Sequence, residues 1–231
     1  ESRSNGTKFN RGDYVGDDFV DRFSFKIDAF ATCGGYTPES QARIFDTSNP
    51  GDGQIDGDPD LGSPNMMCPN GGGPGRGIYG RPGRDGENCT PQGNVLVIQE
   101  SDKATPDDNK KGGVLCFEAT PGTSLDFVSI GLLGIARGPG SFLQAEVVDQ
   151  VAPVQIPFDG LGMNSVQTVP IHLDGVSKLC LFLSGEGAVT NLSLCERRGS
   201  RFLTESMIGA RKASPVIIAA KRSNLRRRTI A

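Results

Sequence analysis

The feature that most constrains the fold is a series of short runs in which apolar and polar residues alternate. From residue 93 onward these runs follow one another at roughly 8–12-residue spacing and are bounded by turn-forming residues. Alternation with period two is typical of half-buried β-strands, and this regular spacing is typical of β-sandwiches and barrels. The sequence therefore predicts an all-β fold, an Ig-like or jelly-roll β-sandwich. The expected strands cover residues 21–29, 42–46, 93–99, 113–119, 125–136, 141–148, 154–158, 166–171, 176–183 and 188–195, with a hairpin loop at 184–187.

Residues 47–92 break this pattern, because they are rich in Gly, Pro and Asp and poor in apolar residues. The chain has 32 Gly and 15 Pro among 231 residues, and much of that excess lies here. A loop of this length inside a compact domain is usually functional or held by crosslinks. Cys68 and Cys89 lie within it, so we expect a disulfide that staples the loop. The predicted organisation is an N-terminal segment 1–20, a sandwich domain 21–196 that contains the 47–92 insertion, and a basic extension 197–231.

The cysteine content also indicates disulfides. An even number of cysteines without a CxxC pair favours disulfides over a zinc site. Alternation places Cys116 and Cys180 on outward strand faces, where we expect a cross-strand bond between them, although other pairings stay open. The six disulfide candidates are Cys33, Cys68, Cys89, Cys116, Cys180 and Cys195.

Glycosylation motifs favour the same compartment as the cysteines. Asn5, Asn88 and Asn191 each begin an Asn-x-Ser/Thr sequon. The chain also starts at Glu1 rather than Met, as a chain whose signal peptide has been removed would. We therefore expect an extracellular or cell-surface protein. There is no run of about 18 apolar residues, so no membrane-spanning helix is predicted.

Charge is divided unevenly along the chain. Residues 197–231 hold ten Lys or Arg and one acid, Glu205, which gives +9, whereas residues 1–196 hold 14 basic and 26 acidic groups, which gives −12. A block of one sign is usually a solvated tail; the alternative is a tail that docks on an acidic surface of the same molecule or of a neighbour. Nucleic acid is not an expected partner, because the acidic body would repel it.

Both ends carry stretches that could form strands outside the sandwich. The N-terminal segment 1–20 and the apolar run 214–220 are β-capable, and 201–213 could form a short helix. Each end either packs on its own domain or pairs with another protomer. Strand addition between protomers supplies main-chain hydrogen bonds, and repeated head to tail it produces a filament.

A cluster of aspartates in the long loop is a candidate calcium site. Closely spaced carboxylates suit Ca²⁺, which takes six to eight oxygen ligands. Counted from Asp56, the pattern begins like an EF-hand loop but has Leu61 at the glycine position and Met67 at the bidentate glutamate position, and a solvated acidic loop is the alternative. A second, weaker candidate is Asp107, Asp108 and Asn109. The residues of the first candidate are Asp52, Asp56, Asp58 and Asp60.

Three separated segments resemble one family. They comprise residues 42–50 with 57–64, then 93–100 with 106–109 and 112–117, and finally 164–170 with 175–179 and 187–192. In this order they resemble the exported β-sandwich domains of bacterial surface proteins of the PEP-CTERM sorting type, over about residues 20–195. The resemblance implies an extracellular sandwich linked to surface matrix or polysaccharide. The chain departs from the family in its cysteine-bearing insertion and in lacking the C-terminal sorting tail; a self-assembling subunit of a pilus-like fibril would need no such anchor.

Catalytic groups are scarce. The only histidine is His172, which leaves little material for a Ser-His-Asp triad, and no pair of carboxylates stands out as a glycosidase pair. We therefore expect no enzymatic activity and no required cofactor beyond possible structural Ca²⁺. The first functional hypothesis is a structural subunit of a fibril or surface layer that binds copies of itself through terminal-strand exchange. The alternative is a Ca²⁺-dependent carbohydrate-binding module with polysaccharide as partner; the absence of Trp weakens it.

Overall fold

The computed structural model describes residues 7–32, 41–53, 57–69, 71–100, 105–197 and 228–230. It confirms the all-β prediction, with 46% strand and 6% helix. A 3-10 turn, η1 (Asp17–Phe19), and a single helical turn, α1 (Val20–Phe23), precede the strands, and a second 3-10 turn, η2 (Pro59–Leu61), lies in the long loop. The strands are β1 (Phe25–Ala31), β2 (Ala42–Asp46), β3 (Asn94–Ile98), β4 (Gly113–Ala119), β5 (Ser124–Leu133), β6 (Phe142–Val147), β7 (Val154–Pro157), β8 (Val166–Leu183), β9 (Ala188–Arg197) and β10 (Arg228–Ile230).

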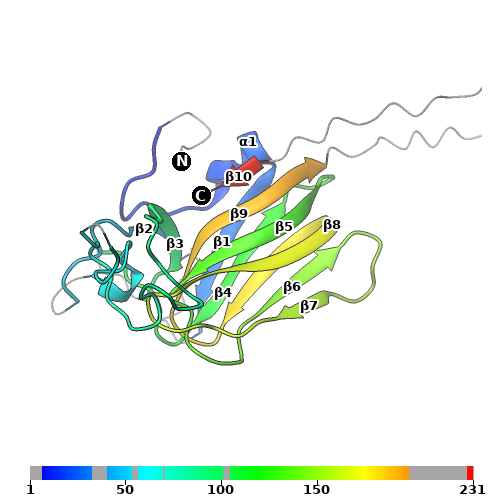
Figure 1. Ribbon diagram of the computed structural model, residues 1–231. Helices are drawn as coiled ribbons and strands as arrows, with labels where there is room; N and C mark the ends of the chain where they lie inside the picture. The colour runs from blue at the N-terminus through cyan, green and yellow to red at the C-terminus, as the bar shows by residue number, and fades with distance from the viewer. Residues whose placement is uncertain are drawn as a thin grey trace, which may run out of the picture.

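The strands form one nearly closed antiparallel sheet that folds over a main core (Figure 1). A second, smaller apolar cluster joins β2 and β3 to Leu61 of the long loop. Its main path runs β1-β4-β8-β5-β9-β3-β2, while β6 pairs with β8 and β7, and β10 pairs with β9. The long strand β8 joins the two walls of the sandwich. Its first part pairs with β5, and its last part lies between β4 and β6.

The predicted strands 166–171 and 176–183 are fused in β8, so the predicted break between them is wrong. His172 and Gly175 have positive φ angles of 51° and 67°, and the pairing with β5 shifts register nearby. These residues bend the strand as a bulge does, without ending it. The predicted hairpin at 184–187 is also wrong, because β8 and β9 are not neighbours; β5 lies between them, so this loop crosses from one wall to the other.

The first strand begins later than predicted. Val20–Phe23 is helical and ends at Ser24, whose φ is 58°, so β1 starts at Phe25. The preceding residues cover the gap between edge strands β1 and β2, where the Ile27 amide donates to the Gly16 carbonyl at 3.0 Å. Phe9, Val15 and Phe19 of this segment are buried in the core of their own chain. Of the two alternatives for segment 1–20, packing on its own domain or pairing with another protomer, its described part shows the first.

The predicted strand faces explain the core and one disulfide. Leu115 and Phe117 of β4 are buried in the main core, together with the leucines of β8. Cys116 and Cys180 lie on the opposite face, directly across from each other in the β4–β8 register, with a Cα–Cα distance of 4.0 Å. They form the expected disulfide. Phe182, also on that face, stacks on Phe142 of β6 at 4.5 Å between ring centroids.

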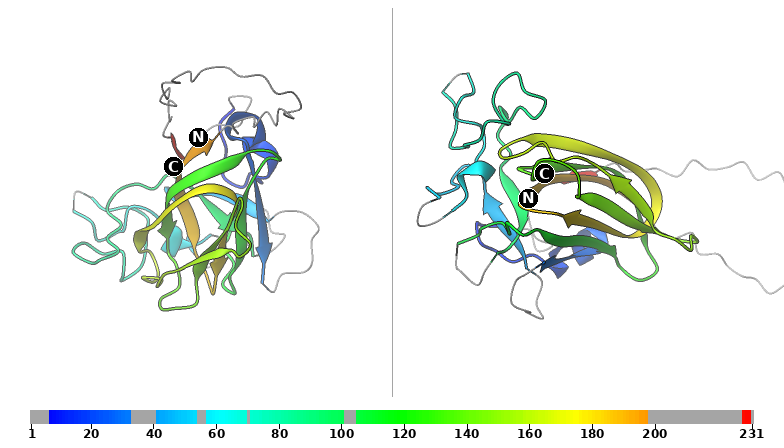
Figure 2. Two further views of the ribbon diagram at one scale, coloured as in Figure 1. Left: turned by 90° about the vertical axis from the view of Figure 1, so that its right-hand side faces the viewer. Right: turned by 90° about the horizontal axis from the view of Figure 1, so that it is seen from below.

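The long loop extends from one end of the sheet (Figure 2). As predicted, a disulfide staples it: Cys68 and Cys89 are bonded, with a Cα–Cα distance of 5.5 Å. Both disulfides are typical of a protein that folds in an oxidising compartment. No helix among the described residues is long and apolar enough to cross a membrane. The predicted helix at 201–213, the run 214–220, Asn5, Cys33 and Asp56 lie outside the described residues.

Candidate functional site

The loops at the end of the sheet that carries the 47–92 insertion are held together by buried amides. Asn164, which is 0% exposed, lies at their centre. Its Nδ2 donates to the carbonyls of Asp60 and Gly62 at 2.9 and 2.6 Å, and its Oδ1 accepts from Asn65 Nδ2 at 2.6 Å. A Cβ on Gly80 would collide with the backbone of Asn164, so only glycine allows this close approach. The loop is thus built into the fold without a large apolar core of its own.

One predicted glycosylation residue belongs to this framework. Asn88 is 0% exposed; its Nδ2 donates to Gly62 O at 3.1 Å and its Oδ1 accepts from Ser63 Oγ at 2.8 Å. A glycan on this nitrogen would have no room in the folded chain, because the side chain is fully buried. Sequence reasoning missed the structural role because a sequon carries no information on burial.

The long loop and two others bring carboxylates together in an acidic cluster, defined as Asp58, Asp60, Asp107, Asp108 and Glu186. Oxygens of Asp58, Asp107 and Asp108 all lie within 4.8 Å of one another. Asp58 occupies the N-cap position of η2 without a capping hydrogen bond, and Asp60 lies within η2. Asp107 and Asp108 belong to the β3–β4 loop, and Glu186 belongs to the β8–β9 loop. Asp108 is 1% exposed, and its Oδ2 accepts from the amide of Gly187 at 2.6 Å.

Burial and mutual repulsion disfavour ionisation of this cluster. Desolvation, together with the neighbouring carboxylates, raises the pKa of Asp58 and of Asp60 to about 8 and that of Asp108 to about 7. Burial also raises the pKa of Glu186, with Asp60 adding repulsion and Lys110 opposing it. Such a site gains stability from anything that supplies positive charge.

The two aspartate groups that the sequence suggested separately meet in this one cluster. Asp58 and Asp60 come from the first predicted calcium site, and Asp107 and Asp108 come from the second. Asp52 is exposed and does not belong to the cluster. Asn109 is buried and uses its side chain in its own turn, where Nδ2 donates to Gly112 O at 2.8 Å.

Beside the acidic cluster lies an open cleft, here called the loop-end cleft. It is lined by the stapled loop, the β5–β6 loop and the segment after β7. The guanidinium of Arg137 lies 5.0 Å from the Tyr79 ring centroid, and its Nη1 donates to the Tyr79 hydroxyl at 3.2 Å. Arg84, Asp85 and Asp159 also line the cleft, and none of its four charged side chains forms an ion pair with a described residue. The cleft therefore presents planar cationic and anionic groups ready for a polar ligand.

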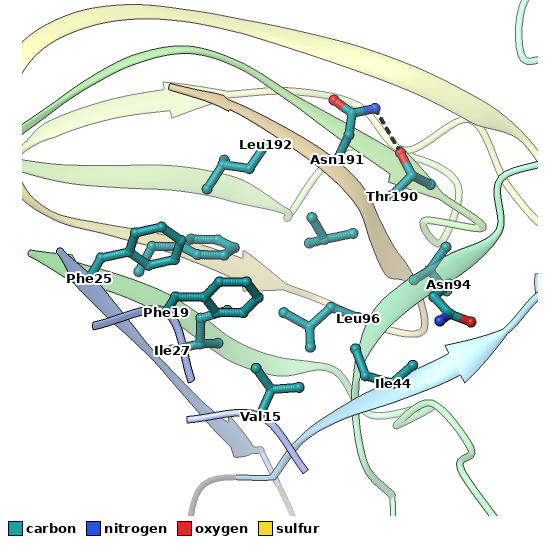
Figure 3. A pocket seen from close by; sticks show the side chains of 13 residues that line it. Val15, Phe19, Phe25, Ile27, Ile44, Asn94, Leu96, Thr190, Asn191 and Leu192 are labelled. Carbon is teal, nitrogen blue, oxygen red and sulfur yellow. Dashed lines mark hydrogen bonds between the residues drawn. The ribbon is translucent and has the colours of Figure 1, made fainter. Parts of the chain in front are cut away.

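A second, apolar pocket of about 50 Å³ opens where β9 and β3 diverge (Figure 3). Only Ala188 and Val189 of β9 pair with β3; beyond them Asn191 and Leu192 line the pocket opposite Val15. The predicted glycosylation residue Asn191 is half-buried at this rim, and its Nδ2 donates to Thr190 Oγ1 at 3.2 Å.

The last described cysteine, Cys195 of β9, is 3% exposed and has no disulfide partner among the described residues. Its predicted disulfide stays a prediction, because Cys33 lies outside them.

Comparisons with known proteins give little further information. No family model matches the chain, and no curated protein matches it. One solved structure, titled as that of an allantoicase, is similar over 41% of this chain and 38% of its own, with a TM-score of 0.22 and 14% identity. A likeness at that level carries no argument about activity.

Proposed function

We propose that the protein is a non-enzymatic extracellular module that binds a carbohydrate in the loop-end cleft. The observation that carries the proposal is the set of arginine and aspartate side chains in that cleft that form no ion pair with a described residue. Arg84 and Asp85 come from the stapled loop, and Arg137 and Asp159 come from loops at the ends of β5 and β7. Planar charged groups form paired hydrogen bonds with vicinal hydroxyl groups, which is how a few polar residues fix the orientation of a sugar.

The framework around the cleft supports this proposal. The Cys68–Cys89 disulfide and the Asn164 hydrogen bonds hold the stapled loop, and the Tyr79 hydroxyl and ring hold Arg137. A binding site that is ordered before the ligand arrives loses less conformational entropy on binding. The disulfides are compatible with the oxidising environment in which surface polysaccharides occur.

Binding of the full chain to soluble acidic and neutral polysaccharides, measured by affinity electrophoresis and calorimetry, tests the proposal. We expect Arg137→Ala and Asp159→Ala each to weaken binding about tenfold or more, because each removes a charged hydrogen-bonding group. Arg81→Ala is the matched control, since Arg81 is an exposed arginine of the same loop that does not line the cleft. Equal binding by all three variants, or no binding across a glycan array, would refute the proposal.

A second candidate function is self-assembly into a fibril or surface layer, and one observation favours it. The short strand β10 pairs with β9, with Arg228 opposite Leu194 and Ile230 opposite Leu192, beside the apolar pocket. The 30 residues 198–227 separate it from the end of β9. If fully extended they span up to about 100 Å, so the same strand could be supplied by a neighbouring protomer.

Truncation after residue 220 separates the two candidate functions. If strand exchange builds a polymer, the full chain forms filaments under the electron microscope and the truncated chain stays monomeric in light scattering. A full chain that stays monomeric at high concentration would exclude this candidate, and neither result depends on carbohydrate binding.

A further inference from the structure

The acidic cluster contains a buried oxygen whose hydrogen-bonding capacity the described protein does not meet. Asp108 is 1% exposed, and its Oδ2 accepts a hydrogen bond from the amide of Gly187. Its Oδ1 is buried and has no hydrogen-bond partner among the described residues. A buried carboxylate oxygen without a donor is costly, and such groups in proteins usually contact a cation or a donor.

The neighbouring groups add negative charge at the same place. Asp58, which is 6% exposed, and Asp107 bring oxygens within 4.8 Å of Asp108, and Asp60 and Glu186 interact electrostatically with the cluster. Lys110 is exposed and only partly opposes this charge. The cluster thus has an excess of buried carboxylate over cationic side chains.

We propose that Asp58, Asp107 and Asp108 bind one Ca²⁺ ion, with the Asp60 carboxylate next to Asp58 as a further ligand. The donor set is entirely oxygen and contains no His or Cys, which excludes the ligands that zinc and copper prefer. Carboxylates from two separate, irregular loops suit the variable coordination of Ca²⁺ better than the strict octahedron of Mg²⁺.

The site connects loops that also build the loop-end cleft. The Ala136 amide, next to Arg137, donates to the Glu186 carbonyl at 3.3 Å, and the Asn164 amide donates to the Asp60 carbonyl. Bound Ca²⁺ would therefore hold η2, the β3–β4 loop and the β8–β9 loop in one arrangement. The inference stands without the proposed carbohydrate binding, because it rests on the carboxylates alone.

The test is calorimetric titration of the metal-stripped full chain with CaCl₂, with thermal unfolding in parallel. We expect one ion per chain with a Kd of about 10⁻⁶–10⁻⁴ M. At a hundredfold excess over Kd, the Tm is expected to rise by about 5–10 °C. MgCl₂ is expected to bind at least about tenfold more weakly. A folded chain that shows no heat of binding and no Tm shift on addition of CaCl₂ would overturn the proposal. A preference for Mg²⁺ or Zn²⁺ over Ca²⁺ would overturn it as well.

Three variants locate the ion. Asp108→Asn and Asp107→Asn each remove one ligand charge while keeping the size of the side chain, and each is expected to weaken Ca²⁺ binding about 100-fold. Asp107 is only half-buried, so its variant serves as the second probe if Asp108→Asn fails to fold. Asp52→Asn is the matched control, because Asp52 is an exposed aspartate of the same acidic loop outside the cluster. Unchanged affinity in both cluster variants, or a loss in the control alone, would overturn the assignment.

Discussion

The sandwich walls and the stapled loop are held together by different forces. The walls bury a continuous set of apolar side chains, many of them less than 2% exposed, between paired strands. The described part of the stapled loop, within residues 47–92, contributes few such residues and is ordered by a disulfide, buried amides and close glycine contacts. Apolar burial tolerates small changes of shape, whereas a hydrogen-bond network depends on every partner. Substitutions in the two regions should therefore fail in different ways.

The largest effect is expected in the walls. Phe127 of β5 is 1% exposed and lies between β8 and β9. Phe127→Ala should lower the free energy of unfolding by about 3–5 kcal/mol, because it removes apolar contacts and leaves a cavity. Urea denaturation followed by circular dichroism measures this loss. A cost below about 1 kcal/mol would show that the walls do not carry the stability assigned to them here.

The two disulfides compare the regions directly. In the chain-entropy model, removing Cys116–Cys180, with a sequence separation of 64, costs about 4 kcal/mol, and removing Cys68–Cys89, with a separation of 21, costs about 3 kcal/mol. We expect the double Cys→Ser change in β4 and β8 to lower global stability. The double Cys→Ser change at Cys68 and Cys89 should instead appear first as faster proteolysis within the stapled loop 47–92, while the strands stay folded. Equal protease resistance of the two variants would contradict this division.

The hydrogen-bond network gives the next effect. Asn164→Ala removes three hydrogen bonds. It also places alanine at a φ of 64°, a left-handed conformation that asparagine tolerates better. We therefore expect the free energy of unfolding to fall by about 2–3 kcal/mol. Amide hydrogen exchange should become faster in the stapled loop and stay slow in β5 and β9. Ser177→Ala, whose hydroxyl makes one exposed hydrogen bond, is the control and should change neither. Uniform acceleration over the whole chain would show that loop and walls form one cooperative unit.

The same contrast explains which features could be predicted from the sequence. Strand positions and the Cys116–Cys180 pair follow from local alternation, so they were predictable. The continuous strand β8 was not predictable. A glycine such as Gly175 fits a turn between two strands as well as a bulge within one, and only the structure shows that His172 and Gly175 adopt positive φ angles inside a single strand. The acidic cluster was suggested only as two separate groups, because no local pattern shows that residues about 50 apart in sequence meet. The buried role of Asn88 was missed for the same reason.

The acidic cluster also makes the loop end sensitive to pH, which the apolar walls are not. In the metal-free chain, burial raises the pKa of Asp58 and of Asp60 from about 3.8 to about 8. Between these values the unfolded chain binds fewer protons, so stability falls as pH rises from about 4 to 8. We expect the Tm to drop by at least about 5 °C over this range. The Asp58→Asn variant should show a smaller drop; an equal drop would place the titrating groups elsewhere.

The smallest effect is expected on the outer face of a wall. Lys178 of β8 pairs with Glu118 of β4 at 3.2 Å, and both side chains are about one-third exposed, at 34% and 36%. Exposed ion pairs of this kind contribute about 0–1 kcal/mol, because water screens the charges and ordering long side chains costs entropy. Lys178→Gln should therefore change the free energy of unfolding by about 0.5 kcal/mol or less in urea denaturation. A loss above about 1.5 kcal/mol would mean that charge on the outer face, and not only apolar burial beneath it, holds β4 against β8.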